Sequence, residues 1–148
     1  MKLFQIEEPD GSPVDPDAPG VAIGIDIAGP DAEVAVAVGG NAALLADREG
    51  FALDLAVPAP SAPAEDWQLL FEGARLRAER ALAQPVTHAV VAVASVPDAA
   101  FATQLSTAGT AAGLTLLRIV AHEALGAGPA VLAAAILAED LAPRPGAP

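Results

Sequence analysis

The chain has 148 residues, 53% of them hydrophobic but only 3% aromatic, a length that suits one domain burying about 70% of its unfolded surface. Nineteen acidic and seven basic residues give a net charge of −12, which repels nucleic acid and anionic membrane surfaces and excludes both as expected partners. The absence of cysteine excludes disulfides and thiolate chemistry, and two histidines far apart give no metal-ligand spacing.

Two proline-rich ends flank the predicted domain. The composition of residues 1–20 and 143–148 predicts a flexible leader and a flexible tail around one folded domain at 21–142. The N-terminal end lacks the apolar core of a signal peptide, and the longest apolar run, 125–138, is too short to span a bilayer. We therefore expect a cytoplasmic protein.

The first half of the domain predicts strands. The β-branched run 21–27 is typical of a strand buried on both faces. Residues 33–38 alternate between apolar and other positions, and a Gly-Gly-Asn turn connects them to another apolar segment at 42–46. These three segments predict an antiparallel meander.

A helix and a further strand follow the meander. Apolar residues at helical spacing predict a helix that ends before Pro85, with Ser61 as its N-cap. Arg75 and Glu79 lie one turn apart on its exposed side. Residues 86–93 predict a second buried strand.

The last third predicts two more helices around a fifth strand. Ser95 and Asp98 match a capping box, and Gly113 ends the helix that this box opens. Residues 114–120 predict a strand, and residues 129–141 predict the last helix. The fold class is therefore α/β, with a five-stranded mixed sheet in the order β-β-β-α-β-α-β-α.

This order resembles the ribonuclease H-like lobe that actin, sugar kinases and heat-shock chaperones share. Residues 24–31, G-I-D-I-A-G-P-D, are similar to G-I-D-L-G-T-T in the first phosphate-binding hairpin of DnaK-type chaperones. Residues 85–93 match the strand before the family's V-P-A-Y-F turn, and residues 107–120 match its D-A-G-x-x-A-G-L-x-V-L-R-I-I segment. The resemblance implies the first lobe of an actin-like ATPase domain.

The phosphate-binding turn departs from the family. There, a glycine and two threonines wrap the phosphates, whereas this chain has Ala28, Gly29 and Pro30, which lack both hydroxyls and one N–H. Asp26, which in the family faces magnesium through water, is retained. With Gly29 it would form a vestigial nucleotide site; alternatively, Asp26 caps the turn that follows it.

Two further family residues have no counterpart. The family's catalytic lysine lies in a subdomain after the third strand, but residues 50–63 contain no lysine, and Lys2 is the only one in the chain. Arg48 is the remaining substitute. His122, followed by Glu123, takes the place of the family's water-positioning glutamate, either as half of an acid–base pair or, as we favour, as a solvated residue.

The sequence also ends before the family's second lobe. We therefore expect no catalytic residues, no metal and no cofactor, and a chain that is not an enzyme. ATP and magnesium would be cofactors only if the chain were a nucleotide-binding protein or ATPase.

The last helix is apolar around its whole circumference. A helix of this kind should be buried on all sides, which predicts an apolar patch that another chain covers, most simply in a homodimer. Alternatively, its small residues tolerate water. The residues of this possible interface are Val131, Leu132, Ile136, Leu137 and Leu141.

These features favour a non-catalytic, chaperone-like binding or assembly module that contacts a protein partner or itself through the former interlobe face. One alternative is a minimal nucleotide-binding protein or ATPase completed by homodimerisation around Asp26. Another is a regulator of a true heat-shock chaperone.

Overall fold

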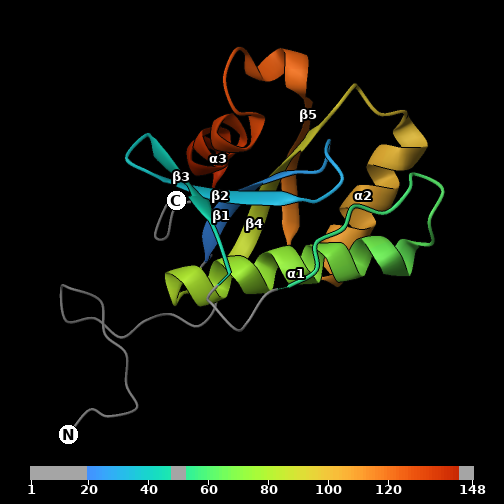
Figure 1. The fold of residues 1–148 in the computed structure, drawn as a ribbon, viewed down its shortest axis with the longest axis horizontal. Helices are drawn as coiled ribbons and strands as arrows, with labels where there is room; N and C mark the ends of the chain where they lie inside the picture. The colour runs from blue at the N-terminus through green and yellow to red at the C-terminus, as the bar shows by residue number, and fades with distance from the viewer. Residues whose placement is uncertain (1–19, 48–52, 144–148) are drawn as a thin grey trace, which may run out of the picture.

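The computed structural model describes residues 20–47 and 53–143 (Figure 1). Most of the predicted leader, almost all of the predicted tail, and both Lys2 and Arg48 lie outside these residues. Within the described ranges, no helix is long and apolar enough to cross a membrane.

A five-stranded mixed sheet forms the centre of the fold, as predicted. The strand order is β3-β2-β1-β4-β5; β2 pairs with β1 and β3 in antiparallel orientation, and β4 pairs with β1 and β5 in parallel orientation. The predicted meander is confirmed, and the third and fifth strands are each displaced by one residue from their predicted positions. The strands are Val21–Asp26 (β1), Glu33–Val38 (β2), Asn41–Leu45 (β3), Val86–Val93 (β4) and Thr115–Ala121 (β5).

Helices cover both faces of the sheet, which gives three layers (Figure 1). The helices α1 (Ala64–Leu82) and α2 (Ala99–Ala111) pack on one face. The helix α3 (Ala130–Leu141) packs alone on the other face, after a short 3-10 turn, η1 (His122–Leu125). The predicted α/β order is therefore confirmed.

Two predicted helix caps are wrong. The side chain of Ser61 does not cap α1, which starts after Pro63 without a side-chain cap. Ser95 does not cap α2 either; its N-cap is Asp98, whose Oδ1 accepts a hydrogen bond from the Phe101 amide at 2.7 Å. Pro97 explains the shift, because the residue before a proline is driven out of helical geometry.

The two faces of the sheet have different cores. On the α1 side, large residues such as Ile23, Ile25, Trp67 and Phe71 are fully buried. On the α3 side the residues are small, and Gly24 allows the helix to lie directly against β1: a Cβ added there would be 2.4 Å from the Ala135 nitrogen. The α3 layer is therefore held by close backbone approach.

Side-chain ion pairs and hydrogen bonds stabilise helices and turns at the surface of the fold. The predicted pair of Arg75 and Glu79 is present at 2.9 Å. The Glu139 carboxylate of α3 accepts hydrogen bonds from the amides of Gly39 and Gly40, at 2.6 and 2.9 Å. Both glycines have positive φ, so the turn between β2 and β3 is a glycine-dependent hairpin that α3 holds in place.

Candidate functional site

Asp26 and His122 meet at one end of the sheet. Asp26 is the last residue of β1 and His122 follows β5, with β4 between these two strands. The Asp26 Oδ1 and the His122 Nε2 are 2.9 Å apart and hydrogen-bonded. Asp26 is 8% exposed, and the His122 side chain is 39% exposed. This pair marks the carboxyl ends of parallel strands, where α/β sheets place their ligands.

The same carboxylate oxygen has a second partner. Asp26 Oδ1 accepts a hydrogen bond from the Ala28 amide at 2.9 Å, which is the contact expected of an aspartate that caps its own turn. His122 is partly exposed, as predicted for a solvated residue, but its ring is also held by the hydrogen bond to Asp26, which the sequence did not predict. Its partner is also not Glu123, which is exposed.

The turn after β1 is tied to the segment before α1. The Pro30 carbonyl accepts a hydrogen bond from the Val57 amide at 2.9 Å, and the Leu55 carbonyl accepts one from the Ala32 amide at 2.8 Å. Gly29 is exposed at the tip of the turn. Among the described residues, no group of three or more His, Asp or Glu side chains could hold a metal ion.

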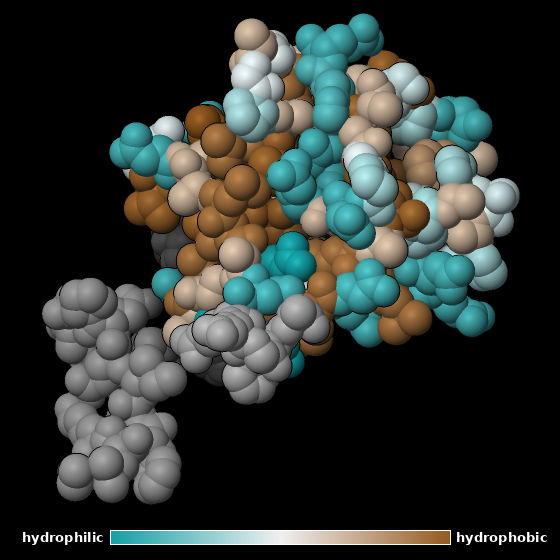
Figure 2. Space-filling view, in the orientation of Figure 1, coloured by the Kyte–Doolittle hydropathy of each residue, from teal (hydrophilic) through white to brown (hydrophobic). Residues whose placement is uncertain are grey.

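The predicted interface residues of α3 do not share one environment. Val131 is 1% exposed and belongs to the core, so its place in an exposed patch is a wrong prediction. Leu132, Leu137 and Leu141 are half-buried, and Ile136 is 37% exposed. Figure 2 shows apolar surface gathered over α3 and the strands beside it.

A groove lies between α3, η1 and β5. Its volume is about 630 Å³. We call it the α3 groove. From α3 it is lined by Ala133, Ile136, Leu137 and Asp140, and from β5 and η1 chiefly by Arg118, Val120, Glu123 and Leu125.

A larger cavity lies beside the carboxyl ends of β1 and β4, towards the side of α1 and α2. Its volume is about 780 Å³. We call it the switch-point cavity, because the chain continues from β1 to β2 on one side of the sheet and from β4 to β5 on the other side. Its walls are residues 27–29, segment 57–61, the turn 93–98, and side chains of α1 and α2 that include Trp67, Phe101 and Gln104.

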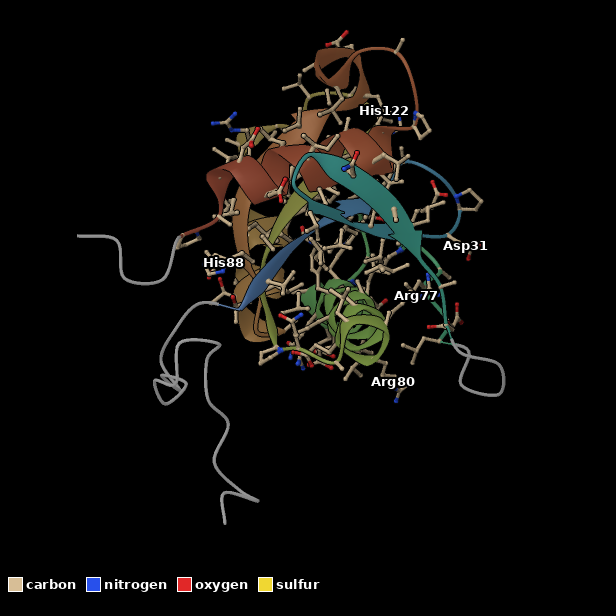
Figure 3. All side chains as sticks on the ribbon, turned by 90° about the vertical axis from the view of Figure 1, so that its left-hand side faces the viewer. Asp31, Arg77, Arg80, His88 and His122 are labelled. Carbon is tan, nitrogen blue, oxygen red and sulfur yellow. The ribbon has the colours of Figure 1, made fainter. Side chains whose placement is uncertain are left out.

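His88 lies at the other end of the sheet from His122 (Figure 3). It is half-buried near the start of β4, and its Nδ1 is 2.7 Å from the Thr87 Oγ1. Burial lowers the pKa of His88 below its ordinary value of 6.5. His88 thus lies far from the Asp26–His122 pair, and its burial disfavours the protonated ring in the folded state.

This shift predicts a pH dependence of folding. Because the folded state holds the pKa of His88 below 6.5, the unfolded chain binds the proton more readily. The contribution of neutral His88 to the free energy of unfolding is complete above pH 6.5 and is lost progressively as the pH falls below that value. In urea titrations at pH 7.5 and 5.5, His88→Gln should lose less stability on acidification than the wild type. An identical loss in the two proteins would contradict the assignment to His88.

No family model matches the chain, and no curated protein matches its sequence.

Proposed function

We propose that the chain has the ribonuclease H-like fold of an actin-like ATPase first lobe, related to DnaK-type chaperones, and acts as a non-catalytic module that binds protein through the α3 groove. The element order and the mixed sheet agree with the resemblance in residues 24–31, 85–93 and 107–120. The partner that the groove fits best is a second copy of the same chain.

Two features of the β1 turn support a non-catalytic role. The carboxylate that in the family faces magnesium is here engaged by His122 and by the Ala28 amide. Pro30 has no N–H to offer a phosphate, and its carbonyl is bonded to Val57. A nucleotide–magnesium complex would therefore have to displace contacts that the chain makes within itself.

The observation that carries the binding role is the composition of the α3 groove. Ile136 and Leu137 supply an apolar floor, with Ile136 more than a third exposed. The charged residues that line it are exposed and of both signs: Arg118 on β5, Glu123 on η1 and Asp140 on α3. An apolar centre within a polar rim is the usual anatomy of a protein interface.

This charge arrangement favours self-association over binding of another acidic protein. In a two-fold dimer, Arg118 of each copy can meet Glu123 or Asp140 of the other copy, so that one patch satisfies both chains. These local pairs offset the repulsion between two chains that each carry a net charge of −12. The charge reversal Arg118→Glu should therefore weaken the dimer.

The test is the mass of the protein in solution over a range of concentrations. We expect a dimer, and Ile136→Glu should raise its dissociation constant at least about 30-fold, because a buried interface centre is worth about 2 kcal/mol or more. Leu69→Glu is the matched control: Leu69 is 65% exposed on α1, in the opposite layer, and its variant should dimerise as the wild type does.

Two results would contradict this proposal. One is a wild-type protein that stays monomeric at high concentration, and the other is a dimer that Ile136→Glu leaves unchanged. Calorimetric titration with Mg-ATP should show no binding. Micromolar binding would instead favour the nucleotide-binding alternative, in which two chains complete a cleft around Asp26.

A further inference from the structure

The two edges of the sheet differ in how they are protected. The strand order places β3 at one edge and β5 at the other. The β5 edge carries the charged Arg118, and its pairing with β4 is irregular between Ala89 and Val90, two features that hinder the addition of a further strand. The β3 edge contains neither a charged residue nor a proline, and its pairing with β2 is regular. Only the β3 edge is therefore an open template.

Within the described ranges, no strand pairs with the outer side of β3. Its ladder partners, residues 34–38, all belong to β2. The segment that returns towards α1 bonds with the β1 turn instead: the Leu55 carbonyl accepts from the Ala32 amide, and the Pro30 carbonyl from the Val57 amide. A free edge of this kind presents amides and carbonyls that can pair with one more strand.

Apolar side chains beside this edge are exposed on both faces of the sheet. Leu44 is 55% exposed on the α3 side, the side of its partner Ala35. Val38 is 73% exposed, and it lies on the α1 side because side chains alternate along β2. Ala43, which pairs with Val36 on that same side, is also exposed. A strand laid along β3 would cover apolar surface on both faces.

The chain contains one segment outside the described residues whose sequence fits this edge. Residues 2–6, K-L-F-Q-I, are as many as those of β3, and Phe4 and Ile6 favour strands. They contain no proline, glycine or acidic residue, whereas residues 7–19 contain all of these. The segment also holds Lys2, the only lysine of the chain.

The charges beside the C-terminal end of β3 suit this lysine. A hollow of about 270 Å³ at that end is lined by the carboxylates of Glu33 and Asp47 and by one cation, Arg77. Arg77 is bonded to both carboxylate oxygens of Asp47, at 3.0 and 2.9 Å, while Glu33 is exposed. The net charge of this group is negative, so it attracts a basic segment more than an acidic one.

The chain between the segment and β1 is long enough to reach this edge. Gly20 directly precedes β1, at the end of the sheet where the turn between β2 and β3 lies. Neighbouring strands are about 4.8 Å apart, so a strand beyond β3 would lie about 15 Å from β1. Residues 7–19 can span about 40 Å, at roughly 3.1 Å per residue for a proline-rich chain.

We propose that residues 2–6 add to the β3 edge as a sixth, antiparallel strand of the same chain. In the register that covers most apolar surface, Leu3 lies opposite Leu44, and Phe4 lies opposite Ala43 on the face of Val38. This strand is independent of the proposed dimer, because the α3 groove lies beside β5, at the opposite edge of the sheet.

Hydrogen exchange of the β3 amides, measured by NMR on the full chain, tests the added ladder. Phe4→Pro removes a ladder N–H and should speed the exchange of every second amide of β3 at least about tenfold, because alternate amides of an edge strand point outward. Val14→Pro, in the linking residues, is the matched control and should exchange as the wild type does. Both substitutions lie outside the described fold and leave its core unchanged.

Engineered disulfides test the register, since the chain has no cysteine of its own. Leu3→Cys combined with Leu44→Cys should form an intrachain disulfide on mild oxidation. Leu3→Cys combined with Ala43→Cys should do so at least about tenfold more slowly, because the side chains of neighbouring residues point to opposite faces. Mass spectrometry of the denatured product distinguishes one chain from two.

Any of three outcomes overturns the proposal. The β3 amides exchange alike in Phe4→Pro and Val14→Pro, the two cysteine pairs cross-link equally fast, or the product has the mass of two chains. The last result would assign the added strand to a second copy. None of the three depends on whether Ile136→Glu weakens the dimer, so this inference and the proposed function can fail separately.

Discussion

Replacing Gly24 with alanine should lower the free energy of unfolding by about 3 kcal/mol, the upper range for forcing an extra carbon into a packed interior. The added Cβ would stand 2.4 Å from the Ala135 nitrogen and 2.8 Å from the Ala134 carbonyl carbon. Both are backbone atoms of α3, so the contact can be relieved only by moving the helix away from β1. Urea titration followed by Trp67 fluorescence and circular dichroism measures the change.

The matched control is Gly29→Ala. Gly29 is exposed, and its nearest atom to an added Cβ is the Asp31 oxygen at 3.8 Å, an ordinary contact. This variant should be as stable as the wild type or more so, by up to about 1 kcal/mol, because alanine restricts the unfolded chain. If Gly24→Ala were as well tolerated as Gly29→Ala, the close seating of α3 on β1 would be refuted.

Gly24 also bears on why the sequence did not show which face of α3 is buried. Apolar residues such as Val131 and Ile136 occur on every side of this helix. The pattern of hydropathy therefore does not identify the side that is buried. The buried residues of α3 are Val131 and three alanines, Ala134, Ala135 and Ala138, which are each 0% exposed, and the backbone of the helix lies close to Gly24. Small side chains therefore make up most of the buried face, a preference that hydropathy does not reveal.

The strands and helices themselves were predictable because their signals are local. Alternation, β-branched runs, the Gly39-Gly40 turn and the proline before β4 all act within a few residues. The caps were less predictable, since Ser95 and Asp98 are both good N-cap residues and only the backbone constraint from Pro97 decides between them.

The candidate site could not be read from local patterns. Asp26 and His122 are 96 positions apart, and they meet only because β1, β4 and β5 are parallel neighbours in register. The resemblance singled out both positions but gave no reason to join them. The switch-point cavity likewise depends on segments from four parts of the chain.

The pairing of Asp26 gives the second large prediction. Asp26→Ala should cost about 2 kcal/mol of stability, because it leaves the half-buried Ala28 amide without its acceptor and His122 without its partner. His122→Ala should cost less, since that side chain is 39% exposed. Asp31→Ala, an exposed aspartate in the same turn, is the control and should change stability by less than about 0.5 kcal/mol.

A double-mutant cycle of Asp26→Ala and His122→Ala then distinguishes an aspartate that stabilises the fold from one whose role is to bind a metal. If Asp26 serves the fold, removing both side chains should cost less than the sum of the two single losses, with a coupling of at least about 0.5 kcal/mol. A carboxylate kept for magnesium should show no coupling to His122, and its removal should leave the free protein no less stable. That second pattern, together with loss of Mg-ATP binding in Asp26→Ala, would identify a working nucleotide site and overturn the non-catalytic proposal.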